Sequence, residues 1–213
     1  MLKNLVLNQN ESIEKATKMN LLIKLEEMIK SNKKLNKLFP NASNLVFGEG
    51  NIDSKVFFIG EAPGKKEDLL ARPFVGASGR ILDKSLSDIK LNRTNVYITN
   101  IVKYRPDENR DPSEYEKSMF LPYLISQISI IRPKLIITLG RHSLNTFLPD
   151  KKINKTHGKI MQINLNDYKS TLNIKSSSNN YNLLSLFHPA ATIYNRNLKH
   201  LWDEDFLKIL NFI

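Results

Sequence analysis

Residues 55 to 68 read KVFFIGEAPGKKED, an apolar run that passes directly into a small, polar turn. A short apolar run bounded by turn residues is typical of a strand that is buried on both faces, as in a parallel sheet. Gly60 and Gly64 let the backbone approach a ligand closely and leave N–H groups free to bind it. The stretch lacks the third glycine of a dinucleotide fingerprint and the Lys-Ser/Thr pair of a P-loop. By itself it predicts a strand and a turn, and no particular ligand.

Three further apolar runs follow, separated by stretches with helical patterning. The four runs are KVFFIG (55–60), NVYITN (95–100), KLIITLG (134–140) and NLLSLFH (182–188). Apolar strands that alternate with helices are typical of a mostly parallel sheet covered by helices on both faces. The polar, Ser- and Asn-rich residues 164–181 predict a strand with a surface loop. We therefore predict an α/β fold.

The first part of the chain has a different character. Residues 12–38 carry apolar side chains near helical spacing and predict one or two amphipathic helices. The turn cluster FPNASN follows at residues 39–44. We therefore divide the chain into an N-terminal helical extension, residues 1–44, and a main domain, residues 45–213.

Composition narrows the possible functions. The 213 residues include 32 Lys and Arg against 21 Asp and Glu, a formal charge of +11, which predicts attraction to a polyanion or an acidic membrane surface. Solubility is the alternative reason for such a charge. The absence of cysteine excludes disulfides, thiolate metal sites and Cys nucleophiles. Without a long apolar run or a signal peptide core, we expect an intracellular protein of the cytoplasm or nucleoid, not bound to membranes.

Polar residues follow the ends of the predicted strands. Ligands bind beyond the carboxyl ends of the strands in open α/β sheets. The turns in these positions begin at Gly60, Asn100, Gly140 and His188. The Asn100 amide offers a donor and an acceptor side by side, although a single Asn is common in ordinary turns. As alternatives to a role in binding, His188 could be a structural histidine with satisfied hydrogen bonds, and Phe74 could be an ordinary core residue.

Five motifs taken together resemble one family. GEAPGKKED, RPFVGASGRILD, NVYITNIVKYRPDENRDPSEYE, LIITLGRHS and LFHPA occur in the order and approximate spacing of the family 4 uracil-DNA glycosylases. The resemblance covers residues 46 to about 190, and the related family 5 shares the first motif. It implies a three-layer α/β/α domain around a four-stranded, mostly parallel sheet. It also implies an enzyme that flips uracil out of DNA and hydrolyses its N-glycosidic bond, leaving an abasic site.

The resemblance implies roles for individual residues. Phe74 would stack on the flipped uracil, Asn100 would bind its N3–H and O4 edge, and His188 would face O2. A donor and an acceptor side by side match the uracil edge, whereas cytosine presents them in the opposite order. A base must leave the duplex to be reached, and stacking and hydrogen bonding in a closely fitting pocket offset the free energy of flipping.

The turn after the first strand would line the same pocket, through Gly60, Glu61, Ala62 and Gly64. Another branch of the superfamily has a catalytic Asp where this chain has Ala62. A different group must then orient the attacking water, and Glu61 is the adjacent acid. We predict a catalytic role for Glu61, with bracing of the turn as the alternative.

The resemblance also places the DNA contacts. In the family, residues after the His-Pro dipeptide enter the minor groove and fill the space left by the flipped base. Here that loop reads HPAATIYNRN, and Ile193 or Tyr194 is the candidate wedge. Arg196 is a candidate phosphate contact, as are Arg141 and Ser143 at a predicted helix start.

The chain departs from the family in its missing cysteines. Family members ligate a 4Fe-4S cluster through four cysteines, and this chain has Tyr104 and Met119 at the two middle positions. We therefore expect no cofactor and no metal. We expect these side chains to pack where the cluster would lie, with the N-terminal helices against the same surface.

Two functions remain open from the sequence. The first is a monofunctional uracil-DNA glycosylase that acts as a monomer on uracil-containing DNA. The second is a catalytically weak or inactive relative that binds DNA or serves as a replication or repair scaffold. Phe74, Asn100 and His188 motivate the first, which is the leading hypothesis. The missing cysteines, the altered wedge loop and the charge of +11 motivate the second.

Overall fold

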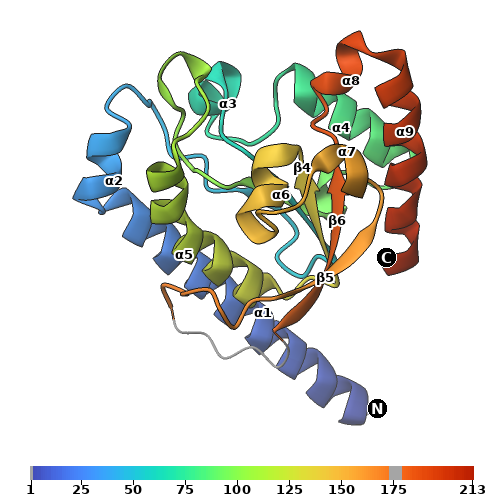
Figure 1. Ribbon diagram of the computed structural model, residues 1–213. Coiled ribbons are helices and arrows are strands. Elements are labelled where there is room, and N and C mark those ends of the chain that lie inside the picture. The colour runs from blue at the N-terminus through green and yellow to red at the C-terminus, as the bar shows by residue number, and fades with distance from the viewer. Residues whose placement is uncertain (1, 173–178) are drawn as a thin grey trace.

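We describe the protein from a computed structural model that covers residues 2–172 and 179–213, without the side chains of residues 2–12, Tyr194 and Arg196 (Figure 1). Its centre is a six-stranded sheet with the order β1-β3-β2-β4-β6-β5. The strands are β1 (Glu49–Gly50), β2 (Val56–Gly60), β3 (Tyr97–Asn100), β4 (Leu135–Leu139), β5 (Ile160–Asn164) and β6 (Asn180–Leu186). The loop predicted within residues 164–181 falls partly outside the described residues.

The predicted four-stranded sheet is the centre of this larger one. Strands β3, β2, β4 and β6 are the four predicted apolar runs, and neighbours among them pair in parallel. The edge strands β1 and β5 pair antiparallel to β3 and β6, and the prediction missed both. Strand β1 has only two residues, and β5 is largely solvent-exposed, so neither forms an apolar run.

Helices connect the strands and cover the sheet. The α-helices are α1 (Leu2–Lys30), α2 (Lys33–Leu38), α3 (Lys65–Leu70), α4 (Ala77–Asp88), α5 (Glu114–Ile131), α6 (Arg141–Phe147), α7 (Ile153–Thr156), α8 (Ala191–Tyr194) and α9 (Arg196–Leu207). Short 3-10 helices are η1 (Arg93–Asn95), η2 (Asp107–Asn109) and η3 (Lys208–Phe212). None of the described helices is long and apolar enough to span a lipid bilayer.

The predicted three layers are confirmed by the way successive strand residues divide between two cores. Phe57 and Ile59 of β2 join a core with α1 and α5, which lie side by side in Figure 1. Val56 and Phe58 join a second core with α4 and α9 on the other face of the sheet. Side chains of a strand alternate between the faces, so one apolar run supplies both cores.

The N-terminal helices belong to the first of these cores. Leu25 and Ile29 of α1 and Leu35 of α2 are fully buried in it, together with main-domain residues. Helix α1 ends before Asn32, which caps α2 by accepting from the backbone N–H groups of Lys34 and Leu35. The proposed division at residue 44 therefore separates two parts of the sequence that share one core.

Candidate active site

The carboxyl ends of the parallel strands form the wall of a cavity of about 220 Å³. Its lining residues are Ala62, Gly64, Glu67, Phe74, Gly76, Ala77, Ser78, Asn100 and His188. The pairing of Gly60 with Asn100 in register brings the ends of β2 and β3 together. The pairing extends past both strand ends, because Val102 N–H donates to Glu61 O at 3.1 Å. The predicted base-pocket residues Ala62, Gly64, Phe74, Asn100 and His188 thus lie around one cavity.

Asn100 lines this cavity with a buried side chain. Its side chain is 2% exposed, yet Oδ1 has no hydrogen-bond partner among the described residues. Buried polar atoms of proteins are nearly always paired, so an unpaired one indicates a missing ligand. Gly60 lies beneath the amide, since a Cβ there would lie 2.3 Å from Asn100 Oδ1 and 2.5 Å from Phe74 Cζ. Gly60 therefore makes room for the two side chains that face the cavity.

Phe74 is held in an unfavourable backbone conformation by its neighbours. Its φ is 52°, in the left-handed region that residues other than glycine rarely adopt. Arg93 donates from Nη1 to Phe74 O at 2.9 Å. Glu67 Oε1 accepts from the N–H groups of Val75 and Gly76 at 2.9 and 2.7 Å. These contacts fix the ring, which is 5% exposed, against the cavity.

His188 presents a neutral imidazole to the same cavity. Burial lowers its pKa to about 4, and the nearby His142 adds to this, so the ring is uncharged at neutral pH. Its Nδ1 accepts from Ala190 N–H at 3.2 Å, which assigns the remaining proton to Nε2. The ring centroid lies 6.1 Å from that of Phe74. His188 is thus an N–H donor placed beside an aromatic platform.

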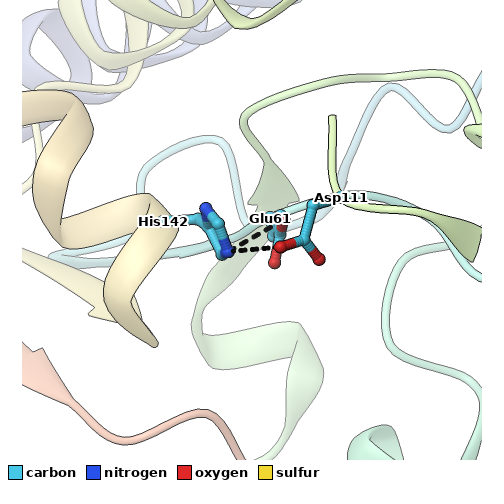
Figure 2. A group of neighbouring side chains, drawn as sticks. All are labelled: Glu61, Asp111 and His142. Carbon is cyan, nitrogen blue, oxygen red and sulfur yellow. Dashed lines mark ion pairs between the residues drawn. The ribbon is translucent and has the colours of Figure 1, made fainter. Parts of the chain in front are cut away.

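Glu61 faces a neighbouring cavity of about 300 Å³, which His188 also lines. Figure 2 shows Glu61 beside His142 and Asp111, with His142 Nε2 3.5 Å from Glu61 Oε1 and 3.1 Å from Asp111 Oδ2. Burial raises the pKa of Glu61 to about 7, and the charge of Asp111 adds to the shift. Glu61 Oε1 is buried and forms no hydrogen bond within the described part of the chain. The carboxyl group can therefore exchange a proton near neutral pH.

No role was predicted from the sequence for His142 or Asp111. Burial lowers the pKa of His142, and the cations of Lys117 and Arg141 beside the ring add to the effect. Asp111 lies in the loop before α5, some fifty residues from Glu61 in the chain, and the pattern of neither stretch indicates this contact. Asp111 does lie inside the motif NVYITNIVKYRPDENRDPSEYE, and this was the one feature of the sequence that could have pointed to it.

The predicted DNA contacts differ in exposure. The Arg141 side chain is exposed and pairs with Asp111 Oδ2 at 3.2 Å, and Ile193 is 45% exposed on α8. Ser143 is fully buried and donates from Oγ to Gly140 O at 3.2 Å, so in this structure its side chain does not reach the surface on which a phosphate would lie. The side chains of Tyr194 and Arg196 lie outside the described part of the structure.

An aromatic cluster lies around Tyr104, one of the positions that the resemblance assigns to a cysteine. Tyr104 lies 5.9 Å from Phe39 and 6.1 Å from Phe120 by ring centroids, and Met119 packs against the same core. Phe39 follows α2, so the N-terminal segment covers this surface as expected. A phenol and a thioether do not supply the thiolates that a 4Fe-4S cluster needs, so the residues present do not fit that group.

The comparisons with known proteins agree with this geometry. The family model described as "Uracil DNA glycosylase superfamily" matches residues 47–211. The type-4 uracil-DNA glycosylase of Sulfurisphaera tokodaii is 42% identical over 90% of this chain and 84% of the relative. Those of Saccharolobus solfataricus and Thermotoga maritima are 41% and 36% identical over 81% of this chain, and over 78% and 85% of their own lengths. The chain belongs to the uracil-DNA glycosylase superfamily, among its type-4 members.

Proposed function

We propose that the protein excises uracil from DNA as a monofunctional glycosylase and leaves an abasic site. The observation that carries the proposal is the buried Oδ1 of Asn100, which has no hydrogen-bond partner among the described residues and belongs to a side chain that lines one cavity with Phe74 and His188. Family membership supports it, since the type-4 relatives are named for this activity. The cavity of about 220 Å³ is smaller than the roughly 300–1,000 Å³ typical of pockets for drug-sized ligands, in keeping with a single base.

Three residues bind the flipped base in this proposal. Uracil stacks on Phe74, and its N3–H donates to the free Oδ1 of Asn100. The amide nitrogen of Asn100 then donates to O4. Cytosine has an acceptor at N3 and an amino group at C4, so it would present two mismatches to the same amide. A site built to pair with one base edge discriminates strongly, because the mismatched base leaves buried polar atoms unpaired.

His188 stabilises the leaving group. When the bond between N1 and C1′ breaks, its electron pair stays on uracil and the negative charge spreads to O2 and O4. The neutral imidazole donates from Nε2 to O2, and its low pKa keeps it in this form at neutral pH. A preorganised donor of this kind is worth about 3–4 kcal/mol in other enzymes.

Water completes the reaction at C1′. The water oxygen forms the new bond to C1′ and its proton passes to a base, for which Glu61 is our proposal. The pKa of about 7 suits a general base at neutral pH, and Oε1 forms no hydrogen bond with the described residues. Glu61 lines the cavity next to the base pocket, so the water would approach past His188.

DNA carrying uracil is the proposed partner. Arg141 is the proposed phosphate contact, and Ile193 on α8 the proposed wedge, with Tyr194 and Arg196 as further candidates from the sequence. We propose that the protein works as a monomer inside the cell, in the cytoplasm or nucleoid. We also propose that it needs no iron-sulfur cluster, because the chain has no cysteine and aromatic packing surrounds Tyr104.

The test is release of free uracil from an oligonucleotide that contains one U, without added metal. Opposed U:G, opposed U:A and single-stranded substrates show which context the protein prefers. Asn100→Ala and His188→Ala should each slow release by roughly 100- to 1,000-fold, the usual result of losing one preorganised donor. Full rate in both variants contradicts the proposed roles. Tight binding to undamaged DNA with no uracil release by the unaltered protein supports the scaffold function instead.

A further inference from the structure

Lys103 lies three residues beyond Asn100 and is fully buried. Its Nζ donates three hydrogen bonds, to Thr99 Oγ1 at 2.6 Å, to the main-chain oxygen of Asn100 at 2.8 Å and to Gln127 Oε1 at 2.6 Å. One of these bonds holds the backbone of the residue proposed to bind the base. The amine therefore lies directly behind the wall of the base pocket.

The three partners of Lys103 all act as acceptors. Thr99 Oγ1 donates its own proton to Phe47 O at 2.8 Å, so it can only accept from Lys103. Gln127 Nε2 donates to the same oxygen at 3.0 Å, which turns Oε1 toward the amine. The third partner is a carbonyl oxygen. Three acceptors require three N–H groups, and only the ammonium form of lysine has them.

The surroundings make this a costly place for a charge. Burial lowers the pKa of Lys103 well below its ordinary value, whereas its three hydrogen-bond acceptors oppose this shift and favour the charged form. No ion pair involves Lys103 in the part of the chain that the structure describes. A buried charge without a partner destabilises a protein, and an apolar side chain of similar shape is often as good for stability or better. Stability alone therefore does not account for a lysine at this position.

We propose that Lys103 is a positioning residue for uracil excision, holding the main chain of Asn100 and placing a buried positive charge behind the base. The inference rests on the proposed function. Because no hydrogen bond from the described part of the chain orients Asn100 Oδ1, the direction of the amide depends on the backbone that Lys103 holds. The uracil gains negative charge as it leaves, and a fixed cation acts strongly through a medium of low dielectric constant.

The experiment compares Lys103→Met, Gln127→Met and the double variant with the unaltered protein. Each is measured for single-turnover uracil release from a single-stranded oligonucleotide, for the affinity of that DNA and for melting temperature. Lys103→Met should lower the single-turnover rate roughly 10- to 100-fold, less than loss of a direct donor. DNA affinity should stay close to that of the unaltered protein, since Lys103 touches no DNA.

Gln127→Met is the matched control, because it breaks the same network but leaves the bond from Lys103 to Asn100. It should lower the melting temperature and keep most of the rate. The double variant replaces both polar partners with apolar side chains, so its melting temperature should recover relative to the single variants. Its rate should remain as low as that of Lys103→Met.

Two outcomes overturn the inference and leave the proposed function intact. One is release at the unaltered rate by Lys103→Met. The other is recovery of rate together with melting temperature in the double variant, which would make Lys103 purely structural. If the unaltered protein releases no uracil, the proposed function fails and the inference falls with it.

Discussion

The base pocket and the aromatic cluster around Tyr104 follow opposite rules of packing. In the pocket, the buried Oδ1 of Asn100 has no hydrogen-bond partner among the residues that the structure describes, and Phe74 takes an unfavourable φ of 52°. In the aromatic cluster, Phe39, Tyr104 and Phe120 fill the space with their rings. The pocket resembles a site that a ligand completes, whereas the cluster is complete without one.

The comparison separates two things that the resemblance implies, namely the residues that would bind uracil and the cysteines that would hold an iron-sulfur cluster. The residues that the resemblance assigns to uracil, Phe74, Asn100 and His188, are present and gathered around one cavity. The position assigned to a cysteine ligand, Tyr104, is occupied by a side chain that packs. A packed core stabilises a fold through many weak contacts, so substitutions that preserve volume and apolarity can replace one another. The residues that bind a base edge tolerate few substitutions, because each hydrogen bond needs a donor or an acceptor of the right kind in the right place.

The strongest test of the pocket is Gly60→Ala. The new methyl group would meet Asn100 Oδ1 and Phe74 Cζ at 2.3 and 2.5 Å, so both side chains must turn away from the base. We expect uracil release to slow by about 100-fold, as for loss of a donor. The protein should still fold, since the atoms displaced are the ends of side chains. Single-turnover kinetics and circular dichroism measure the two effects.

A double variant sharpens this test. Gly60→Ala combined with Asn100→Ala should release uracil little more slowly than Asn100→Ala alone, because residues that act through one another are not additive. If the two losses simply add, Gly60 does not act through Asn100.

The aromatic cluster should show the reverse pattern in Tyr104→Ala. Removal of the half-buried ring leaves space between Phe39 and Phe120, and we expect a loss of about 2 kcal/mol in the free energy of unfolding. Uracil release by the folded protein should be unchanged. Tyr104→Phe is the control and should be close to neutral, because it retains the ring. A slower reaction in Tyr104→Ala at a temperature where the protein is folded would connect the two regions.

The smallest expected effect concerns pH. With its pKa raised to about 7, Glu61 becomes a carboxylate only as pH rises through neutrality, so a rate that depends on this base should rise several-fold over that range. His188 has lost its proton from about pH 4 upward and contributes no change there. The Glu61→Gln variant should be slower and lack the rise. A pH profile identical to that of the unaltered protein would assign the water to another group.

The titration of Glu61 should also change the stability of the fold. Rising pH should lower the free energy of unfolding, whereas it should raise the rate of uracil release. Its pKa is higher in the folded protein than in the unfolded chain, so the folded state holds the proton more tightly. The stabilisation is present below the unfolded pKa and is lost as pH rises through about 7. Urea unfolding of the protein and of Glu61→Gln at pH 6 and pH 8, values that bracket the folded pKa of about 7, would measure this difference.

The sequence predicted those features that depend on local pattern. The four parallel strands are continuous apolar runs, and the polar residues at their ends follow from the rule for ligand sites in open sheets. The edge strands β1 and β5 escaped prediction because one is two residues long and the other is mostly exposed. In helix α1, apolar residue type also fails to predict which side chains are buried. Leu25 is buried, whereas Ile23, equally apolar, is 47% exposed.

The α/β architecture, the family and several residues around the cavity could be predicted from the sequence, because each depends on residue type and order along the chain. The tertiary structure alone decided which of Arg141 and Ser143 reaches solvent, and that Asp111 and His142 gather beside Glu61. It also decided that Lys103 is buried behind Asn100. These facts depend on which elements pack against one another, and burial and proton affinity follow from packing rather than from residue type.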